Sequence, residues 1–229
     1  MKILKNILLL FVICGVFFFS CKKDKPVPQP LNTDYNYYPD DVGRYAIYQI
    51  DSIAYDDVIH PPDTTSYQLK EVIASIFIDN SGRPTLRLER FLKLKKDTGF
   101  PAVPNKVWYA NRTSTTAERV EENIRYIRLV FPSAKNKTWD GNAYNILGQK
   151  QYEIISTDQA ETVNTLFFDS VVTVKQFEQI DFIEKIYEAE KFAKNVGLIY
   201  KQQDSIYTGG NPNKRIGYSF TQKIITYGK

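Results

Sequence analysis

Apolar and polar residues alternate with a period of two along most of the chain after residue 35. In the stretch Leu86–Leu94, leucines at positions 86, 88, 92 and 94 fall on one side of this alternation, and Arg87, Glu89 and Lys93 fall on the other. Such a pattern places one set of side chains on each face of a β-strand. The same pattern predicts strands at 45–55, 67–78, 107–113, 124–131, 152–156, 166–174 and 218–224.

Turn-forming residues separate these strands. Asn80-Ser81-Gly82 predicts a hairpin loop because Gly82 can adopt a positive φ. Thr208–Asn213 predicts a longer loop before the last strand, and Trp139–Asn142 predicts a turn whose tryptophan closes one end of the core.

Two stretches carry helical spacing as well. In 182–196, apolar residues recur at helical intervals, but Ala193–Gly197 is also typical of a turn that leads into a strand at 198–201. We favour a hairpin there and leave the helix open; Thr115–Glu122 is a second candidate helix. We therefore expect a mainly β domain at 35–229: a single antiparallel, curved sheet, as an incomplete barrel or sandwich, with at most one or two short helices.

The first residues follow a different pattern. Lys2 and Lys5 precede an apolar run at 7–19, and Ser20-Cys21 follows before the sequence turns polar. This order is that of an export signal, and the run is shorter than the roughly 20 residues of a spanning helix. A cysteine directly after the small residue resembles the cleavage site of bacterial lipoproteins. That resemblance implies removal of 1–20 and acylation of Cys21, for example with palmitate, as a membrane anchor.

Residues 21–34 predict a tether between this anchor and the domain. Prolines at 26, 28 and 30 alternate with other residues and favour an extended polyproline II conformation. Lys22 rather than Asp follows the cysteine, which, by resemblance to lipoprotein sorting, implies the outer membrane. Whether the protein faces the periplasm or the cell surface is left open.

Composition excludes several classes of function. The 30 Lys and Arg residues nearly balance the 26 Asp and Glu residues, and no basic block follows the signal, so we expect no nucleic-acid partner. One of the two cysteines, Cys14, lies in the signal and the other is the predicted acylation site. The mature domain is therefore expected to lack disulfides and cysteine-based sites.

No pattern of catalytic residues stands out. His60 is the only histidine and lies in a proline-rich loop, so we interpret it as a surface residue. The acidic residues around it, Asp56, Asp57 and Asp63, lack the ligand spacing of a calcium loop. Neither a phosphate-binding loop nor a Gly-x-Ser-x-Gly elbow is present. We expect no enzyme, cofactor or metal.

Aromatic residues are abundant, with 16 Tyr, 14 Phe and 2 Trp. Most are expected to be ordinary strand residues. Exposed rings could instead stack on a ligand, and the candidates for such a surface are Tyr35, Tyr37, Tyr38, Trp108 and Tyr109.

Several short segments resemble uncharacterised lipoproteins of the Bacteroidota: Tyr38–Gly43 with Tyr45–Ile50, Glu122–Pro132, Trp139–Asn145 and Phe192–Lys201. This resemblance implies an envelope location and gives no reaction. The hairpin at Val196–Lys201 also resembles strands of lipoprotein-carrier-like half-barrels. Exported Bacteroidota proteins can carry O-linked glycans at Asp-Ser/Thr followed by an apolar residue or Thr, which implies candidate sites at Ser52, Thr64, Ser170 and Ser205.

Two classes of function remain. The first is an accessory or structural envelope lipoprotein that acts through protein contacts at an exposed sheet edge or face. The alternative is a lipoprotein that binds glycan or lipid on the concave aromatic face of its sheet. A deep aromatic or apolar cavity would favour the alternative, and a filled core with a flat patch would favour the first. Expected partners are the membrane, through the lipid, and an envelope protein or a glycan; the oligomeric state is not predicted.

Overall fold

Twelve antiparallel strands form one continuous sheet in the computed structural model, which describes residues 33–57, 61–211 and 213–229. The predicted signal, Cys21 and His60 lie outside these residues. A 3₁₀ turn, η2 (Tyr35–Tyr37), precedes the sheet. The strands are β1 (Tyr45–Tyr55), β2 (Asp63–Ile78), β3 (Pro84–Leu94), β4 (Lys106–Arg112), β5 (Thr116–Glu121), β6 (Ile124–Val130), β7 (Thr138–Asp140), β8 (Gln151–Val163), β9 (Leu166–Ile180), β10 (Glu184–Ala193), β11 (Gly197–Tyr207) and β12 (Ile216–Gly228).

The sheet consists of two antiparallel meanders, which are joined at the middle of the sheet. Its order is β6-β5-β4-β3-β2-β1-β12-β11-β10-β9-β8-β7. Strands that follow one another in sequence are paired, except for β6 and β7 at the two edges, and β1 pairs with β12 in the middle. The described residues 33–229 belong to one compact unit. The predicted fold class, a single curved antiparallel sheet with almost no helix, is confirmed.

The hairpin predicted in 182–196 is confirmed as β10, a turn and β11. The candidate helix at Thr115–Glu122 is wrong, because this stretch forms the strand β5. The alternation was obscured since both faces of β5 carry charges: Glu118 pairs with Arg83 and Arg125 on one face, and Arg119 pairs with Glu71 on the other.

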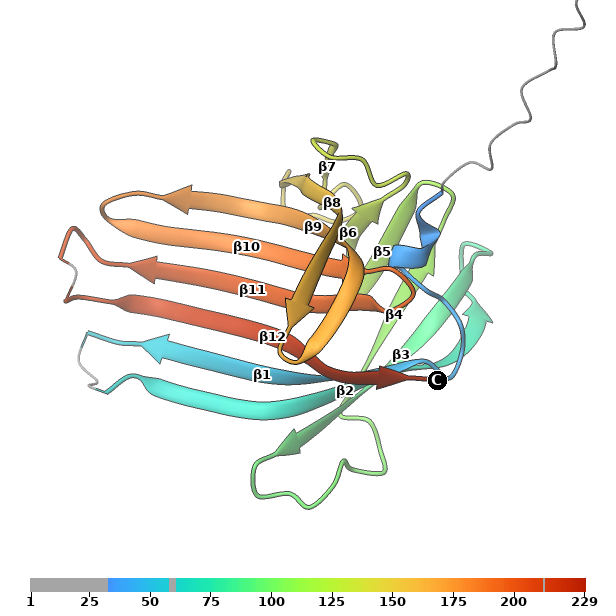
Figure 1. Ribbon diagram of the computed structural model, residues 1–229, viewed down its shortest axis with the longest axis horizontal. Coiled ribbons are helices and arrows are strands. Elements are labelled where there is room, and N and C mark those ends of the chain that lie inside the picture. The colour runs from blue at the N-terminus through green and yellow to red at the C-terminus, as the bar shows by residue number, and fades with distance from the viewer. Residues whose placement is uncertain (1–32, 58–60, 212) are drawn as a thin grey trace, which may run out of the picture. The chain divides into compact units, whose positions relative to one another are not determined.

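The sheet curls so that its two ends meet (Figure 1). The backbone N–H of Ile127 on β6 donates to the carbonyl of Gly141, which follows β7, at 2.9 Å. The indole Nε1 of Trp139 donates to the carbonyl of Ile127, also at 2.9 Å. These bonds form a seam where β6 meets β7. Trp139 packs against the core there, as predicted, but it lies in β7, and the predicted turn begins only at Gly141.

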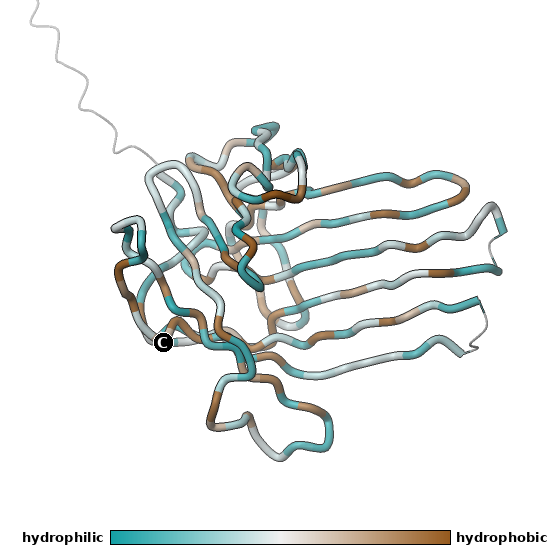
Figure 2. The backbone as a smooth tube through the Cα atoms, turned by 180° about the vertical axis from the view of Figure 1, so that it is seen from behind, coloured by the Kyte–Doolittle hydropathy of each residue, from teal (hydrophilic) through white to brown (hydrophobic). Residues whose placement is uncertain are grey.

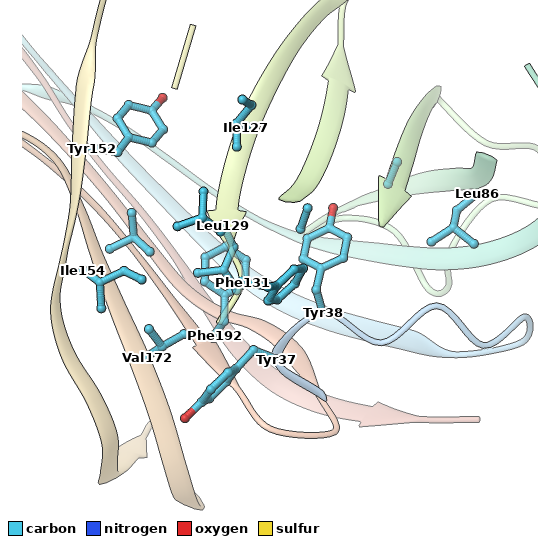
Figure 3. Close-up of a cluster of buried hydrophobic side chains, with 14 of the residues drawn as sticks. Tyr37, Tyr38, Leu86, Ile127, Leu129, Phe131, Tyr152, Ile154, Val172 and Phe192 are labelled. Carbon is cyan, nitrogen blue, oxygen red and sulfur yellow. The ribbon is translucent and has the colours of Figure 1, made fainter. Parts of the chain in front are cut away.

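The main core lies inside this curl. Figure 3 shows Leu129 and Phe131, at the end of β6, gathered with Ile154, Val172 and Phe192 from β8, β9 and β10. All five are buried. We call the side of the sheet that bears Val172 and Phe192 the inner face and the opposite side the outer face.

A second cluster of buried side chains includes the tip of the β8–β9 hairpin. Val163 and Phe168 from this tip pack with Val171, Ala193 and Ile199. Residues 171–174 of β9 are consequently buried on both faces. The strand predicted at 166–174 is confirmed, but its one-sided burial is wrong, because partners cover both of its faces.

Beyond this core, the strands extend as a single layer (Figures 1 and 2). Residues 176–180 of β9 have no β8 partner, and residues 63–66 of β2 have no β3 partner. We call this single layer the blade. It consists of 176–180, 184–188, 203–207, 216–220, 52–55 and 63–66.

Candidate functional site

The register of the blade assigns each side chain to a face, because residues paired directly across antiparallel strands share a face. Phe220 pairs with Gln203, which pairs with Glu188, which in turn pairs with Phe177. This row lies two residues outward from the row that contains the buried Glu190, so it continues the inner face of the core. Further rows of the same parity follow toward the tip.

The inner face of the blade is rich in exposed and half-buried apolar side chains. We call this set the inner blade surface; its members are Phe177, Ile186, Tyr207, Ile216, Tyr218 and Phe220. Tyr207 is 47% exposed, Tyr218 43% and Phe177 38%. Large apolar residues that remain exposed side by side mark an interaction surface more often than scattered single ones do.

Seven charged side chains on the inner face form an ion network at the root of the blade. They are Glu71, Arg90, Arg119, Glu121, Arg128, Glu190 and Lys201. Strands β2, β3, β5, β6, β10 and β11 each contribute at least one of them. The network therefore ties the two walls of the curled sheet together.

Arg128 lies at the centre of one half of this network. Its guanidinium approaches Glu121 at 2.7 Å and Glu190 at 3.6 Å, and Lys201 lies 3.3 Å from Glu190. Burial alone would raise the pKa of Glu121, but the cations Arg128, Lys201 and Arg119 outweigh it and hold that pKa at about 2. Burial lowers the pKa of Arg128, and Glu190 and Glu121 more than reverse this. Glu121 and Arg128 therefore both stay charged at neutral pH.

The other half of the network surrounds Trp108. The guanidinium of Arg90 lies 3.5 Å from the Trp108 ring centroid, and that of Arg119 lies 4.8 Å from it. Both arginines pair with Glu71. Because two arginines stack on it, the Trp108 ring is not available to stack on a ligand.

A cavity of about 70 Å³ lies behind Tyr38, with Tyr48, Glu71 and Arg119 among its lining residues. Sites for drug-sized ligands usually span about 300–1,000 Å³. This cavity can hold a few water molecules but is too small for a lipid chain or a sugar.

The structure does not gather the five predicted stacking residues on one surface. In η2 and just after it, Tyr37 and Tyr38 are buried, with exposures of 0% and 8%. Tyr35 packs edge-on against Phe131, with ring centroids 5.1 Å apart. These three rings support the core.

The remaining two predicted rings point to opposite faces, because they are neighbours on one strand. Trp108 faces inward beneath Arg90, and Tyr109 packs edge-on against Phe77 at 5.5 Å. The sequence did not predict the inner blade surface. Its residues follow the ordinary strand pattern, and a sequence cannot show whether another element covers them.

Of the four candidate glycosylation positions, Thr64 is exposed at the start of β2. Ser52 and Ser205 lie on the inner face of the blade and are half-buried. The Ser170 hydroxyl bonds to the Tyr37 hydroxyl at 2.8 Å and donates to Asp158 at 2.6 Å. Modification at Ser170 would have to break both bonds, whereas Thr64 is accessible.

Within the described parts of the chain, no group of three or more His, Cys, Asp or Glu side chains is placed to hold a metal ion. None of the helical structure found there is long and apolar enough to cross a membrane. In the loop around the undescribed His60, Asp57 pairs with Lys214 at 2.8 Å.

The sequence matches no protein-family model and no curated protein. Two solved structures are similar in fold. One, described as an exported protein with a YmcC-like fold from Bacteroides fragilis, has a TM-score of 0.46 and 11% identity, and covers 83% of this chain and 98% of its own. The other, described as a lipoprotein from Parabacteroides distasonis, has a TM-score of 0.42 and 12% identity, and covers 84% and 98%. Similarity at this level assigns no function to the chain.

Proposed function

We propose that this protein is a non-catalytic accessory lipoprotein of the outer membrane that binds a partner protein through its inner blade surface. The observation that carries the proposal is a set of exposed apolar rings, Phe177, Tyr207 and Tyr218, on an uncovered sheet, next to a core whose cavity behind Tyr38 measures only about 70 Å³. A carrier that encloses its ligand within the core would need a larger cavity there. A partner protein needs an accessible apolar patch.

The sequence of 1–21 supports the lipid anchor, and the fold gives it a geometric consequence. The described chain begins beside η2, at the end of the molecule opposite the tips of the blade (Figure 1). The first described residues therefore do not cover the tips of the blade.

Replacing Cys21 with alanine is expected to abolish acylation, because no other residue of the signal region offers the thiol in that position. The variant should remain unprocessed at full length, and it should not incorporate radioactive palmitate. Labelling followed by cell fractionation measures both effects. Palmitate incorporation into the variant at the wild-type level would overturn the anchor.

Charges on the inner face of the blade define the chemistry of the partner. Glu184, Glu188 and Asp63 lie on this face, and Lys150 from the root reaches Glu188 at 2.7 Å. A complementary surface would be apolar at its centre and rich in Lys and Arg at its rim. Such rim charges speed association and make it sensitive to salt.

Photo-crosslinking in intact cells tests the docking face. A photoreactive phenylalanine is introduced at Tyr218 on the inner face and, as a matched control, at Ile206, which faces outward one residue along the paired strand. We expect a discrete protease-sensitive adduct from position 218 and none from position 206. Adding Tyr207→Ser should reduce the adduct about tenfold or more, since aromatic residues dominate interface energies.

Either equal adducts from both positions or no adduct from position 218 would contradict the docking proposal. An adduct that resists protease but is destroyed by periodate would indicate a glycan partner at this face, and would also contradict it.

A further inference from the structure

The outer face of the blade root carries a groove that the proposed function does not use. It measures about 390 Å³, within the range of small-ligand sites. The tip of the β8–β9 hairpin forms one side, and strands β10–β12 form the floor. Its lining includes Glu161, Asn164, Tyr187, Lys191, Tyr200 and Gln202.

A small residue lies in the floor of the groove. Ala189 pairs with Gln202 on the floor, and its neighbours on the same face of β10 are Tyr187 and Lys191. Lys191 pairs in turn with Tyr200. Ala189 itself is covered, with 1% of the residue exposed, and its small side chain keeps the floor low between two half-buried tyrosines.

The polar groups of the floor are already held in place. The Tyr200 hydroxyl donates to Gln202 Oε1 at 3.0 Å, and Gln202 Nε2 donates to Asp204 Oδ2 at 2.8 Å. Asp204 is buried and also accepts from Ser219 Oγ at 2.6 Å. Fixed partners of this kind lower the entropy lost when a ligand binds.

Two polar groups at the groove remain available. Among the described residues, neither the Lys223 ammonium nor the Tyr187 hydroxyl has a hydrogen-bond or ion-pair partner. Lys191, by contrast, pairs with Glu161 on the hairpin tip. Lys185 likewise pairs with Asp204 at 2.7 Å, so Lys223 leaves one positive charge for a ligand.

We propose that this groove binds an acidic oligosaccharide, with a sugar carboxylate at Lys223 and other sugar units over Tyr187 and Tyr200. An apolar ligand would leave the amide, hydroxyl and ammonium groups without partners, which costs binding energy. A sugar satisfies these groups with its hydroxyls and presents C–H faces to the tyrosines. This groove is independent of the inner blade surface, since the two lie on opposite faces.

Binding of the full-length protein in detergent micelles to an array of uronate-containing and neutral oligosaccharides tests the proposal. Calorimetry then follows the best ligand. We expect Ala189→Leu, which raises the floor of the groove, and Tyr187→Ala to weaken binding at least tenfold. Lys223→Gln should weaken binding of uronate oligosaccharides several-fold and leave neutral ones unchanged. Tyr218→Ser on the inner face is the matched control and should bind normally.

The proposal is overturned if no oligosaccharide binds, or if binding is unaffected by Tyr187→Ala and Lys223→Gln. It is also overturned if polyphosphate binds as tightly as the uronates, since charge alone would then account for the affinity. Thermal unfolding of each variant identifies loss of fold; if Ala189→Leu fails to fold, the Tyr187 and Lys223 variants decide the outcome. If these variants still crosslink normally through position 218, the docking proposal stands whatever the outcome of the oligosaccharide test.

Discussion

Replacing Arg128 with methionine is expected to lower the free energy of unfolding by about 3–5 kcal/mol. Methionine keeps most of the side-chain volume but removes the charge that lies between Glu121 and Glu190. Glu190 is only 3% exposed, so water cannot take the place of the lost guanidinium. Chemical denaturation of the wild type and the variant measures the difference.

A matched control separates burial from charge. The ion pair between Lys106 and Glu122 has a similar distance, 2.7 Å, but both side chains are more than half exposed. Lys106→Met should therefore cost less than about 1 kcal/mol. If the two variants lose equal stability, or if Arg128→Met loses less than the control, the network does not hold the two walls together.

Acid provides a second measurement on the same network. The pKa of Glu121 is lowered from 4.5 in the unfolded chain to about 2 in the fold, so its carboxylate stabilises the fold above about pH 4.5. That stabilisation is lost as the pH falls toward 2, because the proton then binds the folded state as well. In Arg128→Met the pKa of Glu121 rises, and the loss of stability between pH 4.5 and 2 becomes smaller.

Replacing Gly141 with alanine is expected to destabilise the protein by about 2–3 kcal/mol. A Cβ atom at this position would lie 2.4 Å from carbon atoms of the Tyr152 ring. Tyr152 is only 2% exposed and packs edge-on against Trp139, so the ring has little room to move. The strain falls on the seam, where the Gly141 carbonyl accepts from Ile127.

Denaturation gives the size of this effect, and hydrogen exchange at the Ile127 amide locates it. Gly99→Ala is the control, because no atom lies within 4 Å of a Cβ placed there. It should change stability by no more than about 0.5 kcal/mol. Combining Gly141→Ala with Tyr152→Leu should recover part of the loss, since the smaller side chain vacates the space. Faster exchange spread evenly over the sheet would contradict a local effect.

Periodicity predicted those strands in which one face is apolar and the other polar. The strand predicted at 45–55 matches β1 at both ends, because Tyr48 and Ile50 alternate with polar residues. Periodicity failed to predict β5, where Arg119 and Glu121 occupy inward positions at which the pattern requires apolar residues. Their burial depends on partners in distant strands, and no local window of sequence contains those partners.

The candidate site was less predictable than the fold, for a related reason. An apolar strand face shows that something covers it, but not whether the cover belongs to the same chain. Tyr207 and Tyr218 have the same pattern as core residues, yet they lie beyond the last covering strand. The groove depends on Ala189, whose small size has meaning only once Tyr187 and Tyr200 are known to flank it.

The pairing of β1 with β12 has a consequence for how the protein is made. The first and last strands along the chain are hydrogen-bonded neighbours in the middle of the sheet, paired from Tyr45 with Gly228 to Tyr55 with Gly217. The two halves of the sheet cannot join until β12 has been synthesised. Contacts between such distant segments slow folding, so the chain should complete its sheet late in folding. A nonsense mutation that removes β12 would leave two half-sheets with open edges, which are prone to aggregate.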